Sequence, residues 1–147
     1  VVWDKGRLGL GWHYRRSYEL VLVGQKRGAA GRWYGGNSRS NVVRIPGINP
    51  AAAARGDHPT PKPVELMELF ISLHTQVGDL VGDPFAGAGP TLYAAKQLGR
   101  KAIGVELEER WCEMAAKRLQ QEVLPYIERP REAHPTPLSL WDTRHAP

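Results

Sequence analysis

Two glycines and two acidic residues have the types and spacing to bind a nucleotide-like ligand. Asp83 ends a short apolar run, and Gly87 and Gly89 follow in a turn. Glycine lets the backbone bend sharply and approach a ligand without an intervening Cβ atom. Glu106 stands 19 residues after Gly87, where a carboxylate can accept both hydroxyls of a ribose. These residues predict a site for a ligand that carries a ribose.

The elements that would position these residues form one strand–turn–helix–strand unit. Residues 80–83 predict a strand, residues 90–98 a helix that Gly99 closes, and residues 102–106 a second strand. The helix would direct its amide-rich N-terminus at the glycine turn, where it suits a negative or polar group of a ligand. This order is typical of the front of a βαβ fold.

The glycine turn lacks residues that two common phosphate sites require. A dinucleotide fingerprint has a third glycine three positions after Gly89, where Leu92 stands. A phosphate-binding P-loop has Lys and then Ser or Thr after Gly87, but Ala88 and Gly89 follow. Neither pyrophosphate nor triphosphate is therefore favoured. The alternative is a plain strand–helix turn whose glycines only permit close packing.

The string DPFAGAGPT at residues 83–91 resembles the DPFxGxGxT motif of S-adenosylmethionine-dependent DNA amino-methyltransferases. The resemblance implies that the cofactor turn consists of Asp83, Phe85, Gly87, Gly89 and Thr91, with Glu106 on the ribose. Pro90 departs from the small polar residue usual in this turn. It removes one amide donor, which we expect to weaken binding without changing the ligand.

A second motif, HPTPKP at residues 58–63, stands before a predicted helix. Pro63 can occupy the first helical turn, where its missing amide costs nothing. The apolar face of the helix would consist of Leu66, Leu69, Phe70 and Leu73. HPTPKPVELMELFI resembles the HPT-x-KP motif placed just before DPFxGxG in the same family, which implies that Thr60 and Lys62 border the methionine end of the cofactor. Without that resemblance, a solvated lysine at a proline-rich helix entry is the simpler interpretation.

The first 26 residues predict two strands joined as a β-hairpin at a sheet edge. Residues 18–23 are almost continuously apolar, which predicts a strand covered on both faces. The whole string WDKGRLGLGWHYRRSYELVLVGQK resembles the segment that follows the catalytic region in the same methyltransferases. Arg15 and Arg16, next to Trp12 and Tyr14, suit phosphates and bases of DNA. They equally suit packing of their stems on the sheet.

Positive charge is concentrated at the start of the chain, where residues 1–62 hold 11 Lys and Arg against 3 Asp and Glu. This predicts a polyanion partner, or alternatively a solvated basic face. Residues 28–57 are rich in Gly, Asn, Pro and Arg, with one predicted strand at residues 41–45. In the resembled family a short target-recognition loop lies here, and the residues suited to DNA are Arg32, Trp33 and Arg39. A passive surface loop is the alternative.

The remaining features of the sequence concern its last helix, its tail and the classes of site that its composition excludes. A helix is predicted over residues 108–123, with Leu107, Trp111, Ala115 and Leu119 on one face and Trp111 and Cys112 in the core. Residues 125–147 form a proline-rich tail. The single cysteine excludes an internal disulfide and a cysteine-based zinc site, predicts no metal site, and fits a reduced cytoplasmic setting. There is no signal peptide and no apolar run of about 18 residues, so no membrane partner is expected.

The chain lacks the motif that would orient the reacting amine. The resembled family uses Asp, Asn or Ser followed by Pro-Pro-aromatic, and this sequence contains none. In the family's order that motif precedes the Trp3 strand, so we expect it before Val1 and assign no catalytic residue. The strands are too few for a complete doubly wound sheet. We therefore expect a Rossmann-like α/β methyltransferase sheet that is incomplete at its N-terminal side, over residues 1–124, with the cofactor part at 58–121.

The resemblance implies transfer of a methyl group from S-adenosylmethionine to the amino group of adenine or cytosine in double-stranded DNA, as in restriction-modification. The target base would be flipped out of the duplex. One alternative is a non-catalytic remnant that binds DNA or a partner subunit, supported by the missing motif. A nicotinamide-dependent oxidoreductase is disfavoured by Leu92 and the basic first half. We expect the chain alone to be poorly stable and inactive, because a sheet edge is left unpaired.

Overall fold

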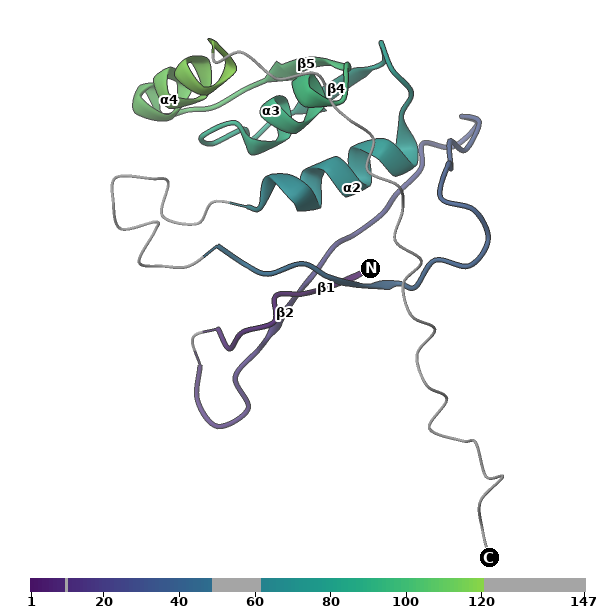
Figure 1. Ribbon diagram of the computed structural model, residues 1–147, viewed down its shortest axis with the longest axis vertical. Helices are drawn as coiled ribbons and strands as arrows, with labels where there is room; N and C mark the ends of the chain where they lie inside the picture. The colour runs from purple at the N-terminus through teal and green to yellow at the C-terminus, as the bar shows by residue number, and fades with distance from the viewer. Residues whose placement is uncertain (10, 49–61, 121–147) are drawn as a thin grey trace, which may run out of the picture.

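The computed structural model describes three stretches of the chain: residues 1–9, 11–48 and 62–120 (Figure 1). The elements in chain order are β1 (Val2–Asp4), β2 (Tyr18–Leu20), β3 (Val42–Arg44), α2 (Val64–His74), β4 (Leu80–Asp83), α3 (Pro90–Gln97), β5 (Lys101–Gly104) and α4 (Glu109–Gln120). The predictions for Thr60 and for the tail at 125–147 lie outside these stretches. No helix within them is long and apolar enough to cross a membrane.

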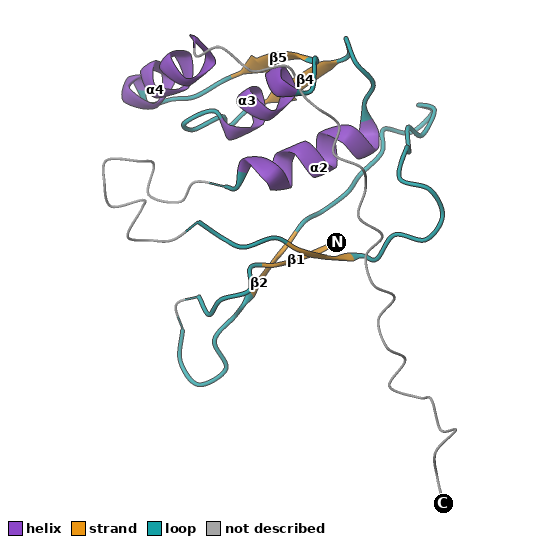
Figure 2. Ribbon diagram, viewed as in Figure 1, coloured by secondary structure: helices purple, strands orange, loops and turns teal. Residues whose placement is uncertain are grey.

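The described strands form two small sheets, drawn as orange arrows in Figure 2. In the first sheet β1 is central, antiparallel to β2 and parallel to β3, so that Trp3 stands opposite both Glu19 and Val43. In the second sheet β4 and β5 are parallel. The predicted hairpin and the predicted strand near residues 41–45 are therefore confirmed. The hairpin lies at an edge of this three-stranded sheet, as predicted, because β2 is an outer strand and β3 pairs with the other side of β1.

Strand β2 is shorter than predicted, and it is not covered on both faces. The ladder ends at Leu20, and the side chain of Leu22 is 94% exposed. Val21 packs against the core, whereas Tyr18 and Leu20 are exposed. An antiparallel strand can present one face to the core and the other to solvent, and here only one face meets a helix. The prediction of a strand buried on both faces is wrong for the described residues.

Helix α2 is the central layer, lying between the β2-β1-β3 sheet and α3 (Figure 1). Its Leu66 forms a buried cluster with Trp3 and Ile45 of the sheet, where the Trp3 indole N–H donates to the Ile45 carbonyl at 2.8 Å. Its Ile71 packs instead against the buried Ala94 and Ala95 of α3. The sequence predicted one apolar face for this helix. Because the helix is sandwiched between two layers, it buries two.

The predicted strand–turn–helix–strand unit is confirmed as β4, α3 and β5, and α3 covers one face of the two strands. A Cβ atom on Gly104 would lie 2.7 Å from Leu92 and 2.9 Å from Ala86, so the strand and helix are in close contact there. The other face of this sheet carries exposed apolar side chains, namely Leu80, Ile103 and Val105.

Helix α4 packs against the unit through Trp111 and Ala115, which are buried as predicted. Two predictions for this helix are wrong. Cys112 is exposed, because successive residues of a helix point about 100° apart and Trp111 occupies the inner position. Leu107 precedes the first residue of the helix and is exposed in the loop after β5 instead of extending its apolar face.

Candidate functional site

The glycine turn lies at the carboxyl end of β4, where ligands of open α/β sheets bind. The Phe85 amide donates to the Asp83 carboxylate at 3.0 Å, and the Ala86 amide donates to the Val105 carbonyl at 2.9 Å. The second bond ties the turn to the end of β5. Gly87 and Gly89 have φ angles of +52° and +74°, a left-handed conformation that side chains disfavour. The prediction that these two positions require glycine is thus met by their backbone geometry.

The Glu106 carboxylate lies directly on the glycine turn. One oxygen accepts the Gly87 amide at 2.8 Å, and the other accepts the amides of Leu107 at 2.9 Å and Glu108 at 3.0 Å. The carboxylate therefore joins the turn after β4 to the loop after β5. The two halves of the predicted ribose site, remote by 19 residues, are in contact in the folded chain.

Gly89 also serves the packing of α4. A Cβ atom at this position would lie 2.8 Å from the Ala115 Cβ atom and 3.3 Å from its Cα atom. This distance is shorter than carbon atoms tolerate, so α4 can approach the turn only because Gly89 has no side chain. Gly89 thus permits close packing of α4 and also adopts a left-handed backbone in the turn, while Gly87 donates its amide to Glu106.

Helix α3 starts directly at the turn, with Gly89 as its N-cap and Pro90 as its first residue. Within the described residues, no side chain caps this end by a hydrogen bond. Proline fits the first position because its fixed φ is helical and the amide that it lacks would have no partner within the helix. Thr91, half-buried, is the next residue. The helix therefore points an uncapped N-terminus at the turn, although Pro90 leaves it one donor short.

Phe85 and Leu107 are large apolar residues in the loops after β4 and β5. Their side chains are 88% and 97% exposed. Both flank the residues that Glu106 connects, since Phe85 lies within the turn and Leu107 donates its amide to the carboxylate. Exposed apolar side chains beside a polar turn suit the flat face of a heterocyclic ring.

The structure brings Lys62 to Glu19 of β2, a contact that no sequence pattern predicted. The Lys62 ammonium lies 3.0 Å from the Glu19 carboxylate and 5.8 Å from the centre of the Trp3 ring. Lys5 contacts the same carboxylate at 3.4 Å. Burial raises the pKa of Glu19, but the hydrogen bonds and charges of Lys62 and Lys5 outweigh burial and hold it below its ordinary value. The role of Lys62 at the cofactor stays a prediction.

The loop between β1 and β2 carries two of the residues predicted to meet DNA, Arg15 and Arg16, and both are exposed. The Arg15 side chain donates to the Gly9 carbonyl at 2.8 Å, and the Gly9 amide donates to the Arg16 carbonyl at 2.7 Å. Figure 1 shows β1, β4 and β5 running in the same sense, so this loop lies at the same end of the strands as the glycine turn. The arginine stems do not pack on the sheet.

Three other residues predicted to meet DNA lie in the segment between β2 and β3, at the opposite end of the strands (Figure 1). Arg32 forms an ion pair with Asp79 at 2.7 Å, and Trp33 packs on the His74 ring with centroids 5.4 Å apart. The Tyr34 amide donates to the Leu73 carbonyl at 2.9 Å. These contacts fix the segment to the end of α2. Arg39 is exposed further along it.

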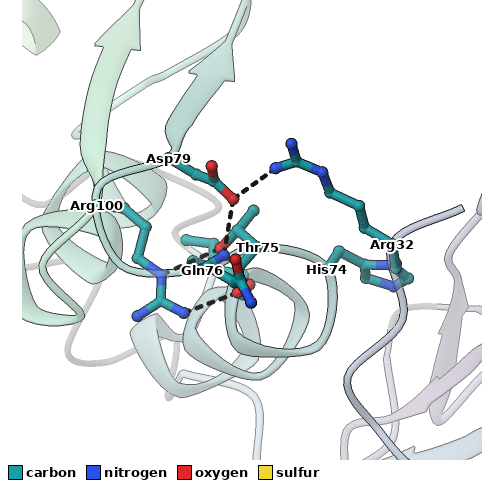
Figure 3. Close-up of polar contacts among 7 residues, drawn as sticks. Arg32, His74, Thr75, Gln76, Asp79 and Arg100 are labelled. Atoms are coloured by element: carbon teal, nitrogen blue, oxygen red, sulfur yellow. Dashed lines mark hydrogen bonds and ion pairs between the residues drawn. The ribbon is translucent and has the colours of Figure 1, made fainter. Parts of the chain in front are cut away.

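A polar network surrounds this attachment, and Figure 3 shows its side chains. Asp79 accepts the Gln76 amide at 2.8 Å in addition to Arg32, and these hydrogen bonds lower the pKa of the Asp79 carboxyl. Arg100 donates to the hydroxyl and the carbonyl of Thr75 at 3.1 and 2.9 Å. The network ties α2 to the starts of β4 and β5. No local sequence pattern indicates this network, because Arg32 and its partner Asp79 are 47 residues apart.

The fold and the site define an α/β domain with a ligand turn at the carboxyl ends of its parallel strands. The model of a DNA methylase family matches residues 2–117, most of the chain. The chain therefore belongs to the DNA methylase family.

Similar proteins agree with this assignment. The chain is 46% identical over 67 residues to the type II methyltransferase M2.DpnII of Streptococcus pneumoniae, covering 46% of this chain and 25% of that protein. It is 36% identical over 93 residues to M2.MboI of Moraxella bovis, covering 63% and 34%. Among solved structures it resembles the M1.HpyAVI–SAM complex, with 31% identity and a TM-score of 0.69 over 82% of this chain and 61% of that one. The chain thus spans a quarter to a third of these two curated relatives, and the likeness in structure confirms the Rossmann-like α/β fold.

Proposed function

We propose that this chain is the S-adenosylmethionine-binding part of an enzyme that methylates an amino group of adenine or cytosine in double-stranded DNA. The observation that carries the proposal is the contact between the Glu106 carboxylate and the Gly87 amide within DPFAGAGPT. Family membership and the likeness to a SAM complex support it. The relatives are DNA methyltransferases by name, which supports DNA as the substrate.

Different residues of the site would bind different parts of the cofactor. Glu106 would accept the ribose hydroxyls, which compete with the backbone amides that it now binds. The uncapped start of α3 would meet the polar end of the ligand, and Thr91 lies there. Phe85 would cover the face of the adenine ring. The cofactor supplies the methyl group, and the residues that orient the accepting amine are not assigned to this chain.

Calorimetric titration with S-adenosylmethionine tests the proposal. We expect the wild-type chain to bind, and Glu106→Ala to bind about tenfold or more weakly, since a hydrogen bond to a charged group contributes about 1.5–3 kcal/mol. Glu108→Ala is the matched control, because it removes a neighbouring exposed carboxylate that pairs with Arg110. Circular dichroism checks that each variant is folded. If Glu106→Ala and the wild type bind S-adenosylmethionine equally well, Glu106 does not contact the cofactor.

A non-catalytic remnant is the second candidate, favoured by the absence of Asp, Asn or Ser followed by Pro-Pro-aromatic anywhere in the sequence. It is distinguished by the same titration, because a remnant that has lost its chemistry need not keep the cofactor. A nicotinamide-dependent oxidoreductase would bind labelled nicotinamide cofactor in preference to S-adenosylmethionine. We expect the opposite order, since Leu92 stands where a dinucleotide site has its third glycine.

DNA would approach the end of the strands that carries the glycine turn, and Arg15 and Arg16 are the proposed phosphate contacts there. Contact of Arg32, Trp33 and Arg39 with DNA stays a prediction from the sequence, and the ion pair of Arg32 with Asp79 supports a structural role for that arginine. We propose action in the cytoplasm, where a lone exposed thiol such as Cys112 stays reduced.

A further inference from the structure

The loop after β1 exposes two large aromatic side chains. Trp12 is 83% exposed and Tyr14 is fully exposed. Among the described residues, the Trp12 ring meets the edge of the His13 ring, with centroids 5.5 Å apart. Apolar side chains that are exposed together on one surface mark sites where a partner binds. We call residues 11–16 the aromatic loop.

The stem of the aromatic loop holds its tip away from the sheet. The Lys5 amide donates to the Ser17 carbonyl at 2.8 Å, continuing the pairing of β1 with β2. The Gly9 amide donates to the Arg16 carbonyl at 2.7 Å, and the Arg15 side chain donates back to Gly9. The loop therefore projects as an extension of the hairpin. Its base is fixed by backbone hydrogen bonds.

The charge on this loop and its stem points to a polyanion as the partner. Residues 7–16 include Arg7, Arg15 and Arg16, and no Asp or Glu. Arginine side chains bind phosphates through several donors and also stack on bases. Aromatic rings flanked by arginines are the combination that nucleic-acid-binding surfaces use. A protein partner with an acidic surface would leave the two aromatic rings without matching flat faces.

The position of the aromatic loop relates it to the proposed reaction. It lies at the same end of the strands as the turn that Glu106 contacts (Figure 1). An enzyme that acts on a base must take that base out of the stack, which leaves a gap in the duplex. Apolar side chains can enter such a gap and replace the lost stacking. Two aromatic rings at the end of a fixed hairpin suit this task.

Resting on the proposed function, we propose that the aromatic loop is a wedge that enters duplex DNA beside the target base. Trp12 and Tyr14 stack on the bases that border the gap, and Arg15 and Arg16 hold the flanking phosphates. The loop thereby stabilises the flipped-out state, while the glycine turn holds the cofactor that the flipped base must reach. No bond is made or broken by the loop.

The test compares two duplexes of equal length, one intact and one with a single abasic position. Fluorescence anisotropy of the labelled duplexes gives the affinity of the full chain for each. A wedge binds the abasic duplex more tightly, because the gap is already open. We expect Trp12→Ala/Tyr14→Ala to bind the abasic duplex about tenfold more weakly and to lose the preference. Trp12→Phe/Tyr14→Phe keeps aromatic faces and should keep the preference.

Two controls separate this inference from the proposed function. Leu22→Ala removes an apolar side chain of similar exposure outside the loop and should leave both DNA affinities unchanged. Titration of each variant with S-adenosylmethionine should match the wild type, since the loop does not hold the cofactor. A folded double alanine variant that keeps the wild-type preference for the abasic duplex overturns the wedge, and so does a wild type that binds both duplexes equally. Failure of the wild type to bind the cofactor would overturn the proposed function, and a preference that depends on Trp12 and Tyr14 would still support the wedge.

Discussion

Gly89 joins two parts of the chain that are remote in sequence. Its φ of +74° shapes the glycine turn, and its missing Cβ atom admits Ala115 of α4. The first property follows from the local motif and was predictable. The second depends on a residue 26 positions later, and no local pattern in the sequence indicates it. The same limit applies to Lys62, whose partner Glu19 lies 43 positions earlier.

Substitution Gly89→Ala should destabilise the fold by about 2–4 kcal/mol, as the sum of a left-handed backbone cost and a clash with α4. Gly28→Ala is the matched control, because Gly28 has a similar φ of +79° and open space around its Cα atom. Gly28→Ala should lower the free energy of unfolding only by the cost of the left-handed backbone, about 1–2 kcal/mol. Urea unfolding measures both. If the two variants lose equal stability, a Cβ atom at position 89 does not clash with α4.

At the scale of elements, α2 positions the rest of the described chain. It buries Leu66 against the first sheet and Ile71 against α3, and its last residues receive the segment that contains Arg32 and Trp33. Helical periodicity predicted this helix, and glycine spacing predicted β4, α3 and β5. Neither predicted that the helix has two buried faces, since periodicity gives the apolar positions of a helix but not the number of layers around it.

The ion pair of Arg32 with Asp79 should make stability depend on pH. Hydrogen bonds from the Gln76 amide and from Arg32 hold the pKa of Asp79 below its ordinary value of 3.8. A carboxyl whose pKa is lower in the folded state contributes stability above its unfolded pKa and loses it as pH falls through the folded value. Asp79→Asn should therefore unfold at lower urea than wild type at pH 7.

The difference between Asp79→Asn and wild type should narrow as pH falls below about 3.8. Glu113→Gln is the matched control, because it removes an exposed carboxylate of α4 that lies outside this network. A difference between Asp79→Asn and wild type that stays constant from pH 7 to pH 2 would show that the charge of Asp79 contributes nothing to the attachment of this segment.

At the scale of the whole molecule, α3 covers one face of the β4–β5 sheet in the part of the chain that the structure describes. Leu80, Ile103 and Val105 are exposed on the other, whereas parallel sheets are normally covered on both faces. The chain also spans only a quarter to a third of the two curated relatives it was compared with. Both facts agree with the expectation of an α/β sheet that is only part of the family's fold. The sequence predicted an incomplete sheet, because the amine-orienting motif, which precedes the Trp3 strand in the family's motif order, is missing.

The chain by itself should not methylate DNA, even where it binds the cofactor. No residue that the structure describes is assigned to orient the amine, and the sequence lacks the family's motif for that step. Incubation with S-adenosylmethionine that carries a labelled methyl group, followed by counting of label in purified DNA, measures the activity. We expect no label above a sample without protein. Robust incorporation by the 147-residue chain would contradict the division between cofactor binding and chemistry.

The position of the cofactor is tested most directly by backbone amide resonances of the ¹⁵N-labelled chain during titration with S-adenosylmethionine. The amides of Gly87, Leu107 and Glu108 donate to the Glu106 carboxylate, so they should respond when ribose hydroxyls compete for it. We expect these three amides and that of Phe85 to shift most, and those of Trp33 and Arg39, at the opposite end of the strands, to shift less. Saturating cofactor that leaves the amides of Gly87 and Leu107 unmoved would contradict the assignment of the site.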